Sequence, residues 1–587
     1  MRSYKFSDLD SRQERPLKGP FLIFLIFHMP ASLIHFFGIV SLALAWLAYD
    51  HYRPWVNFHS EALALAGVAL LMLSRGLANK SKTASAPTIA LYVMVLAFIP
   101  WLQYVGGISL FAGDALVVSL FLAGLAGAIW LGHNYAAALP DGEDALASVF
   151  HMLWFVGLVS AAIGLVQWLN LQESLGMYVV QTSAGDRAMG NLGQPNQLAT
   201  LLLVGMASLA WAYERRRMGG IGLVAGVLFM SMGLVLTQSR AGMLSAVVVA
   251  LFLFWKNYAT PARLAPRYIA GWLLAYGAAV QILPFVHEWL LMADPRSMNV
   301  GVDSARVTIW KQMLSGIAQA PWFGYGWNQT PTAHAAGSLA VPGSMTYTNA
   351  HNVVLDLLAW NGVPLGLLLT GACAYWFVSR IRGASQPGAI YAMACLLPIA
   401  VHSMVEYPFA YSYFLLTAGL MAGVVEASHR AVQTFKVNLH WAGLALTIWS
   451  AAGLYMAYEY LLVEEDFRIV RFENLRIGQT PAEYKVPDIW MLSHMGAMLT
   501  AARQQALPGM VTSDLENLRK VSLRFPYGSL SLRYAIALGL NGDPMGATRQ
   551  MAVVRGMYGD YYYQAAVSVL RGLQREKYPE LVLVITP

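Results

Sequence analysis

The sequence predicts an all-α, polytopic membrane protein. Of its 587 residues, 57% are hydrophobic and only 12% are charged, which is about half the charged share of an ordinary soluble domain. Apolar stretches recur along most of the chain with the length that a membrane-spanning helix needs, roughly 17 to 25 residues. The Lys and Arg residues stand in short groups between these stretches. This pattern is typical of orientation signals and does not indicate a nucleic-acid partner.

About thirteen stretches qualify as spans. They cover residues 21–49, 62–74, 87–105, 115–133, 145–168, 197–213, 220–236, 242–255, 268–291, 352–378, 389–401, 409–426 and 441–462. We therefore expect a short N-terminal tail at 1–20 and a transmembrane domain at 21–462. The long segment at about 292–351 contains no apolar span, and loops of such length are often functional. From residue 463 the composition becomes rich in Arg, Glu, Tyr and Gln, which predicts a soluble helical segment at 463–587.

The positions of Lys and Arg predict the orientation. The tail carries five basic residues and lacks the small-residue cleavage site of a signal peptide, so we expect it to be retained in the cytoplasm. Alternation from there places the other basic loops on the cytoplasmic side; these contain Arg75, Lys80, Lys82, Arg215 to Arg217, Lys256, Arg263, Arg267, Arg380, Arg382, Arg430 and Lys436. The segment at 292–351 and the C-terminal segment then lie on the outer side.

Local signals predict helices in the C-terminal segment. Ser513 and Glu516 have the spacing of a capping box, and Asp543 followed by Pro544 has the pattern of an N-cap with proline at the first helical position. Two short helices could then pack as a hairpin through Ala535, Leu538, Ala547 and Met551. An irregular helical tail is the alternative.

Four polar groups stand where outer loops enter or leave spans. They are Arg187 with residues 190–196, Arg240 within 237–242, His351 within 347–352, and Glu406 within 402–408. Polar residues near a membrane core are costly, and helix ends can converge on one cavity. The alternative is that the arginines extend to lipid headgroups and that the histidine is merely solvated.

The residue types argue against metal and cofactor chemistry. The outer carboxylates are scattered at Asp114, Asp186, Asp294, Asp303 and Glu406, so they predict no paired site for a divalent ion. Cys373 and Cys395 are too few for a thiolate metal cluster. An arginine pair could instead hold a pyrophosphate, because the guanidinium group matches phosphate oxygens with two parallel donors.

The order of short motifs resembles the superfamily of O-antigen ligases, O-antigen polymerases and bacterial protein O-oligosaccharyltransferases. The superfamily-wide features are Arg240 in 237–242, Arg306-x-x-x-Trp310 followed by 321–326, and the block 349–352. Three further blocks, at 51–61, 190–196 and 402–408, look particular to the protein-glycosylating branch. Gln103 and residues 113–115 are similar to that branch as well, and the resemblance extends to the C-terminal segment.

The resemblance implies a GT-C-like inner-membrane enzyme whose active site faces the periplasm. The implied donor is a glycan linked to undecaprenyl pyrophosphate, and the implied acceptor is a hydroxyl on a periplasmic protein such as a pilin. The resemblance also implies a reaction without metal or cofactor. Arg187 and Arg240 would stabilise the leaving pyrophosphate, and His351 would act as the general base. The substrate-binding residues would be Tyr347, Asn349, Gln194, Asn196, Glu406 and Arg306.

Other functions remain open at this point. An O-antigen ligase would transfer to the lipid A core, and an O-antigen polymerase would extend the glycan. A transporter of a lipid-linked sugar would place charged groups at the membrane midplane and alternate its access between the two sides. A structural assembly factor would need neither the arginines nor the histidine.

Overall fold

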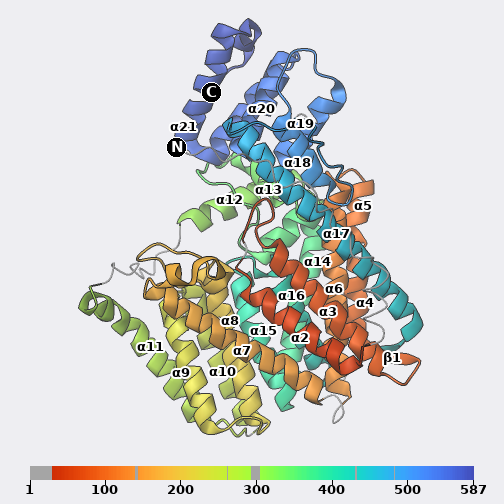
Figure 1. Ribbon diagram of the computed structural model, residues 1–587, viewed down its shortest axis with the longest axis vertical. Coiled ribbons are helices and arrows are strands. Elements are labelled where there is room, and N and C mark those ends of the chain that lie inside the picture. The colour runs from red at the N-terminus through yellow and green to blue at the C-terminus, as the bar shows by residue number, and fades with distance from the viewer. Residues whose placement is uncertain are drawn as a thin grey trace, which may run out of the picture.

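The computed structural model describes residues 29–49, 51–138, 143–260, 262–291, 304–429, 432–481 and 483–586. Most of the described chain is helical, and it forms a bundle of apolar helices with a smaller group of helices at one end (Figure 1). The predicted N-terminal tail, with Asp294, Asp303 and Arg430, lies outside the described residues.

The bundle contains the helices that coincide with the predicted spans. They are α2 (Ala31–Leu47), α3 (Phe58–Ala78), α4 (Thr88–Leu96), α5 (Ile99–Val105), α6 (Ala112–Ala137), α7 (Glu143–Trp168), α8 (Pro195–Glu214), α9 (Gly220–Leu236), α10 (Arg240–Ala259), α11 (Pro266–Trp289), α14 (Val353–Gly383), α15 (Pro387–Ser403), α16 (Ser412–Ala427) and α17 (Leu439–Leu475).

Length and apolar composition make this part of the chain a multi-pass membrane protein. In the described residues, seven helical segments are long and apolar enough to cross a membrane, and α2, α9, α15 and α16 are shorter apolar helices. Each predicted span overlaps a helix of the bundle. Helices α8 and α17 are long enough but not apolar enough to be among them, so the number of thirteen spans stays a prediction.

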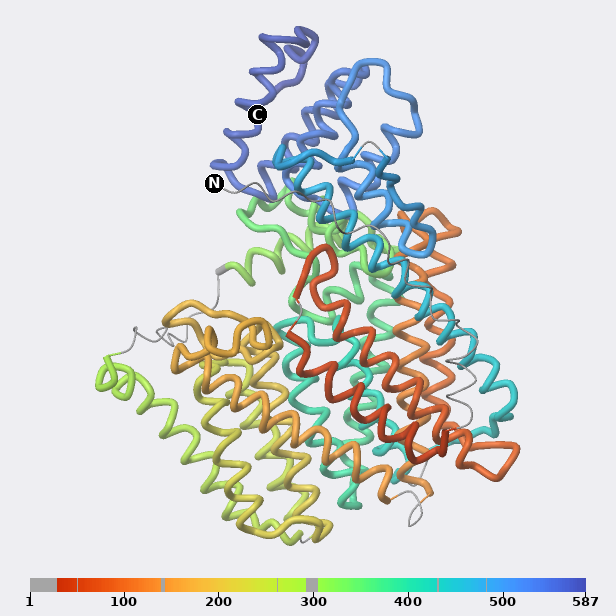
Figure 2. The backbone as a smooth tube through the Cα atoms, in the orientation of Figure 1, coloured from red at the N-terminus to blue at the C-terminus, as the bar shows by residue number. Residues whose placement is uncertain are grey.

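The segment predicted as a long loop at 292–351 contains two helices where it is described, α12 (Ser304–Gln319) and α13 (Thr330–Ser338). A C-terminal module follows α17 and consists of α18 (Ser493–Arg503), α19 (Thr512–Arg524), α20 (Gly528–Leu540), α21 (Pro544–Glu576) and the short η4 (Pro579–Leu583). Helix α17 continues through the change of composition near residue 463, and Figure 2 shows it passing along the bundle to this module.

The N-terminal signals of two module helices had different outcomes. Asp543 caps α21 as predicted, because its side chain accepts a hydrogen bond from the Gly546 amide at 2.8 Å and Pro544 occupies the first turn. The prediction of a capping box at Ser513 is wrong, because α19 begins at Thr512 and its N-cap residue is Val511, which makes no side-chain cap hydrogen bond. The Asn541 side chain accepts from the Met510 amide at 2.8 Å, and this contact fixes the chain where the helix starts.

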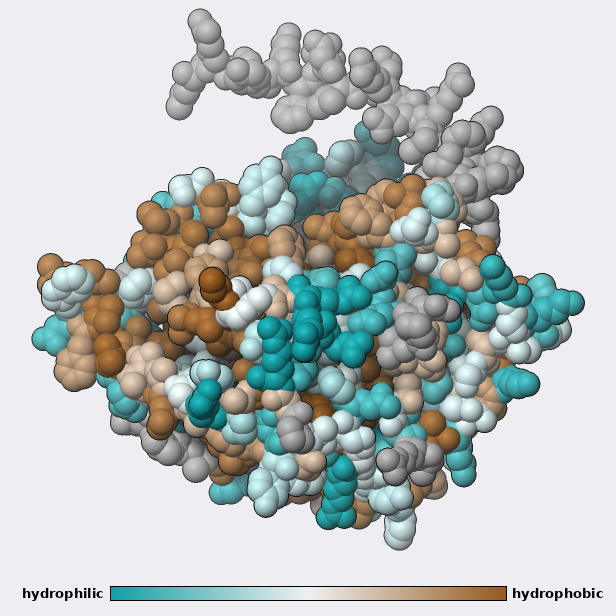
Figure 3. Space-filling view, turned by 90° about the horizontal axis from the view of Figure 1, so that it is seen from below, coloured by the Kyte–Doolittle hydropathy of each residue, from teal (hydrophilic) through white to brown (hydrophobic). Residues whose placement is uncertain are grey.

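The loops predicted to be cytoplasmic meet at one end of the bundle. Strands β1 (Thr83–Pro87) and β2 (Thr434–Asn438) pair antiparallel there, although no strand was predicted. Arg215 forms an ion pair with Glu143 at 2.7 Å, and the Lys256 ammonium donates to the Arg382 carbonyl at 3.0 Å. Seen from this end, hydrophilic side chains gather near the middle of the face and hydrophobic surface borders them (Figure 3).

Small residues allow two central helices to pack closely. A Cβ atom added at Gly132 of α6 would collide with the Leu420 carbonyl oxygen of α16, and one at Gly423 would collide with the Ile129 carbonyl oxygen. Without a hydrophobic driving force between helices in lipid, such close backbone contact is a main source of association.

Helix α14 is broken in the middle by a segment that follows α12. Gly362 has a φ of 74°, which glycine adopts without steric cost. The freed carbonyls of Ala359 and Trp360 accept from the amides of Tyr325 and Gly326 at 2.8 and 3.1 Å. The motif block 321–326 therefore has a structural role, because it satisfies the exposed backbone of the broken helix.

Candidate active site

His351 lies in the turn that leads into α14. Its φ is 52°, which is uncommon for a residue other than glycine. This backbone conformation costs about 1–3 kcal/mol and persists only where the surrounding structure holds it. On one side the Asn352 side chain caps α14 by accepting from the Val354 amide at 2.9 Å. On the other side the buried Asp356 carboxylate accepts from the Ala350 amide at 3.0 Å. These two contacts fix the backbone on both sides of His351.

Glu406 connects three of the predicted site residues. One carboxylate oxygen lies 2.5 Å from Nδ1 of His351, and the other lies 2.5 Å from an Arg306 nitrogen. The Asn196 amide also donates to this second oxygen, at 3.3 Å. Burial alone would raise the pKa of Glu406, but the hydrogen bond and charge of His351 and the charge of Arg306 outweigh it and lower that pKa to about 2.

The ionised Glu406 determines which proton His351 can exchange. A carboxylate only accepts hydrogen bonds, so Nδ1 of His351 must be the donor in their contact. In the neutral ring, Nε2 then carries a lone pair and can accept a proton from a substrate. Tyr347 and Tyr407 meet the ring edge-on, with centroid distances of 5.6 and 4.8 Å, and restrict its orientation.

A chain of hydrogen bonds extends from Glu406 to Arg240. Asn196, in the first turn of α8, accepts from the Ser239 hydroxyl at 2.7 Å. Ser239 is also the N-cap of α10, where it accepts from the Gly242 amide at 2.9 Å. Arg240 is the first residue of α10 and is half-buried. The structure thus brings Arg240 close to the group around His351.

Arg187 lies beside the end of α9. The amide of its neighbour Ala188 donates to the Leu236 carbonyl at 3.2 Å, four residues before Arg240. The Gln167 side chain accepts from the amides of Met189 and Gly190 at 3.1 and 2.8 Å and fixes this segment. Arg187 itself is half-buried.

Three helix N-termini meet at this place. Helices α8, α10 and α14 begin at Pro195, Arg240 and Val353. The contacts of Asn196, Ser239 and Glu406 join their first turns. A helix N-terminus carries a partial positive charge and unpaired amide donors. The arrangement therefore favours an anion such as a phosphate group.

The remaining predicted residues lie at the edge of this group. Gln194 is half-buried and directly precedes α8. Asn349 is buried and accepts from the Thr348 hydroxyl at 3.3 Å. The structure therefore joins His351, Glu406, Arg306 and Asn196 by direct bonds, with Tyr347 against the His351 ring. No group of three or more His, Cys, Asp or Glu side chains that could hold a metal ion occurs within the described ranges.

Sequence reasoning missed two residues that support His351. Asp356 is fully buried, and it accepts from Ala350 and from the Thr330 hydroxyl, the latter at 2.7 Å. Its signal was visible, because an acidic residue inside the predicted span 352–378 requires a polar partner. The Ser239 hydroxyl was also missed, and serine directly before an apolar helix is a common N-cap.

The first motif block of the protein-glycosylating branch supports the arginine segment. His51 contacts the Asn57 side chain through Nδ1 at 2.7 Å and the Asn191 carbonyl through Nε2 at 2.5 Å. Asn191 in turn donates to the Leu47 carbonyl at 2.9 Å. The blocks 51–61 and 190–196 are therefore one structural unit that positions the start of α8.

The C-terminal module contacts the bundle near the segment that leads to His351. Arg524 of α19 forms a buried ion pair with Asp114 of α6 at 2.9 Å. The Gly343 amide donates to the Gly556 carbonyl of α21 at 2.7 Å. The module thus packs against residues eight positions before His351.

Three family profiles match different parts of the chain. The profile described as "Protein glycosylation ligase" matches residues 188–211, and the profile described as "O-Antigen ligase" matches 225–370. A third, described as "Virulence factor membrane-bound polymerase, C-terminal", matches 390–571. Arg240, Arg306 and His351 fall within the second match, and Glu406 falls within the third.

Two curated relatives match nearly the full length. The chain is 27% identical over 542 residues to the "General O-oligosaccharyltransferase" of Acinetobacter baylyi, covering 89% of this chain and 92% of the relative. It is 24% identical over 504 residues to the "ComP-specific O-oligosaccharyltransferase" of the same organism, covering 85% and 90%.

The apolar bundle and these matches define the class: the protein is a multi-pass membrane glycosyltransferase. Within that class it is similar to oligosaccharyltransferases and O-antigen ligases, and the resemblance drawn from its motifs is confirmed.

Proposed function

We propose that this enzyme transfers a glycan en bloc from an undecaprenyl-pyrophosphate donor to a Ser or Thr hydroxyl of a periplasmic protein. The contact of His351 with the ionised Glu406 supports this proposal most directly. This contact fixes the tautomer of His351 as a general base, close to the helix N-termini that suit a phosphate group. In this proposal the enzyme is located in the inner membrane, and its active site opens to the periplasm.

The arginines and helix N-termini would act on the leaving group. Cleavage of the bond between the anomeric carbon and the phosphate oxygen leaves negative charge on the lipid pyrophosphate. Arg187, Arg240 and the first amides of α8 and α10 would stabilise this charge as it develops. Arg306 has a different role in the proposal, because its contact with Glu406 keeps that carboxylate ionised.

His351 would act on the acceptor. Its Nε2 takes the hydroxyl proton while the oxygen attacks the anomeric carbon, and the lipid pyrophosphate leaves from the opposite face. One glycosidic bond forms, one bond to phosphate breaks, and the anomeric configuration inverts. Glu406 then stabilises the positively charged ring. The assignment of Glu406 thereby changes from substrate binding to positioning of His351.

Transfer by the purified protein tests the proposal. The detergent-solubilised enzyme is incubated with an undecaprenyl-pyrophosphate glycan and a pilin-like acceptor, and intact mass identifies the product. We expect one glycan added to a Ser or Thr, with the opposite anomeric configuration by NMR and no loss of rate in excess chelator. A product that retains the configuration would refute the single displacement, and loss of rate in chelator restored by magnesium would refute metal independence.

The match to the O-antigen ligase profile over 225–370 favours a second acceptor, the lipid A core. Cells that lack the chain distinguish the two acceptors. Loss of intact glycopeptides supports the protein acceptor, whereas loss of glycan from lipid A with normal glycopeptides supports the second.

A further inference from the structure

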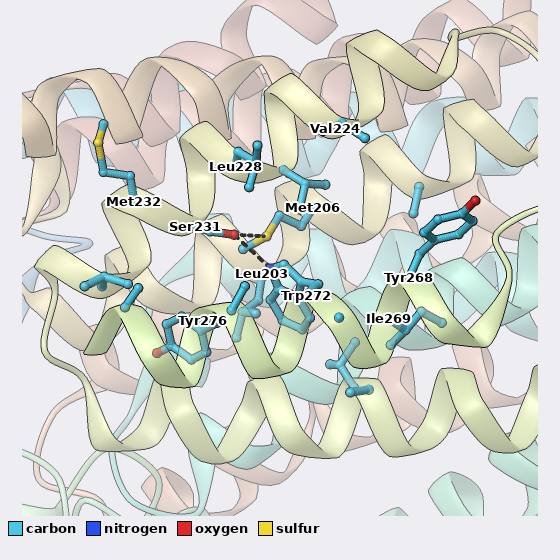
Figure 4. Close-up of a pocket in the computed structure, with 18 of the residues that line it drawn as sticks. Leu203, Met206, Val224, Leu228, Ser231, Met232, Tyr268, Ile269, Trp272 and Tyr276 are labelled. Atoms are coloured by element: carbon cyan, nitrogen blue, oxygen red, sulfur yellow. Dashed lines mark hydrogen bonds between the residues drawn. The ribbon is translucent and has the colours of Figure 1, made fainter. Parts of the chain in front are cut away.

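A cavity of about 700 Å³ lies between helices α8, α9, α10 and α11. Figure 4 shows its lining, with Trp272 and Tyr276 of α11 facing residues of the other helices. The lining includes Leu203, Met206, Leu228, Ser231, Trp272 and Tyr276. The volume lies in the range of roughly 300–1,000 Å³ that is usual for small-molecule sites.

The chemistry of the cavity suits a hydrocarbon chain. Its lining is almost wholly aliphatic and aromatic. The Ser231 hydroxyl near its centre accepts from the Trp272 indole at 2.8 Å and lies 3.6 Å from the Met206 sulfur, toward which it donates. This hydroxyl is therefore already paired, and it gives a polar ligand little to bind.

The cavity begins beside the proposed pyrophosphate site. Leu236, the last residue of α9, lines it, and its carbonyl accepts from the amide next to Arg187. Helix α10 starts at Arg240, and Val249 and Ala250 of the same helix also line the cavity. The arginines thus stand at one end of the helices whose apolar faces form the cavity walls.

We infer that this cavity holds part of the isoprenoid tail of the donor while its pyrophosphate lies at Arg187 and Arg240. The inference rests on the proposed function. Membrane lipid is as apolar as the cavity, so transfer of the tail from lipid adds little binding free energy. The favourable free energy comes chiefly from packing of the tail against a fixed wall, as it does between helices in a bilayer. We therefore expect the cavity to improve donor affinity by about tenfold.

Two glycines of α11 provide a matched test. Gly271 lines the cavity and Gly277 does not. A Cβ atom at either position would meet no atom within 4 Å. Gly271→Trp would fill the cavity, whereas Gly277→Trp adds the same side chain to the same helix outside it. Ala279→Trp, another lining position, provides a second filled variant in case Gly271→Trp does not insert into the membrane.

The assay uses one glycan pyrophosphate on two tails, undecaprenyl and geranyl. We expect Gly271→Trp to raise the KM for the undecaprenyl donor by at least about tenfold, to leave the KM for the geranyl donor unchanged, and to keep kcat. Gly277→Trp should change neither. If the wild type does not turn over the geranyl donor, inhibition by undecaprenyl and geranyl pyrophosphate provides the same comparison.

Equal KM changes for both tails would overturn the inference. So would a loss of thermal stability in Gly271→Trp with no change in donor preference, because the cavity would then hold a structural phospholipid. A different result would contradict the proposed function, namely a wild-type enzyme that transfers glycan from neither donor.

Discussion

The two sides of the candidate site are held by different forces. On the histidine side, charged and buried groups fix the ring: Glu406 lies between His351 and Arg306, and Asp356 holds the preceding amide. On the arginine side, backbone contacts and helix caps position Arg187 and Arg240 beside an apolar cavity. A general base needs one fixed geometry, whereas a lipid-linked leaving group must enter from the membrane and depart again.

The comparison predicts the largest loss of transfer on the arginine side. We expect Arg240→Ala to reduce kcat/KM by about a thousandfold, at the upper end for a lost charge-stabilising donor. Arg240→Lys should recover little, because an ammonium lacks the paired donors. The exposed Arg267 at the basic-loop end provides the control, since Arg267→Ala should transfer normally. Full activity of purified Arg240→Ala at saturating donor would remove the phosphate role.

On the histidine side, His351→Ala should reduce single-turnover transfer by at least about a hundredfold, the lower end for a lost general base. Donor affinity should stay unchanged, because the proposal assigns pyrophosphate binding to the arginines. His440→Ala, at an exposed position on α17, is the matched control. The base assignment fails if His351→Ala binds donor weakly but turns it over at the normal rate.

Glu406→Gln separates positioning from chemistry. We expect about a tenfold to hundredfold loss in kcat with little change in the KM for donor, because His351 loses the carboxylate that orients and stabilises it. In the wild type the folded pKa of about 2 lies below the ordinary value of 4.5. The stabilisation from Glu406 is therefore complete above about pH 4.5 and lost as the pH falls toward 2. Glu576→Gln, exposed at the end of α21, should behave as the wild type.

Asp356→Asn tests how far the support of His351 extends. Asparagine keeps one acceptor oxygen for the Ala350 amide but replaces the second carboxylate oxygen with an NH2 donor, so we expect about a tenfold lower kcat with an unchanged KM for donor and a lower Tm. Asp356→Glu, which restores both acceptor oxygens at a different reach, should recover part of the rate. If the KM for donor rises instead, Asp356 supports the arginine side and the comparison is wrong.

Acid should destabilise the segment around His334. His334 of α13 is fully buried beside Tyr347, and burial lowers its pKa to about 4. The unfolded chain binds this proton near pH 6.5, so stability falls as the pH drops from about 6.5 to about 4, by roughly 3 kcal/mol over that interval. Hydrogen exchange should show amides 330–346 losing protection as the pH falls from 7 to 5. His334→Gln should remove this loss, and unchanged protection of these amides in the wild type at pH 5 would contradict the prediction.

Periodicity and length predicted most helices but not their interruptions. The span predicted at 115–133 corresponds to α6, whereas the one predicted at 352–378 contains the break at Gly362. That break depends on residues 321–326, which hydrogen-bond to it from another part of the chain. The helices α12 and α13 were missed because their short, weakly apolar sequences give no span signal.

The motifs predicted candidate site residues but not which of them touch. His351 and Glu406 are 55 positions apart, and one sequence contains no signal that pairs them. Glu406 was therefore assigned to substrate binding, although its contacts within the chain make it a partner of His351. Asn196 was predicted as a binding residue, and its bond to Ser239 depends on the packing of α8 against α10.

The ion pair between Asp114 and Arg524 makes the C-terminal module inseparable from the bundle. Arg524→Ala would leave the buried Asp114 carboxylate in the first turn of α6 without its counter-charge, at a cost of about 3–5 kcal/mol. A module exchanged from a related enzyme would therefore have to bring an arginine to the same carboxylate.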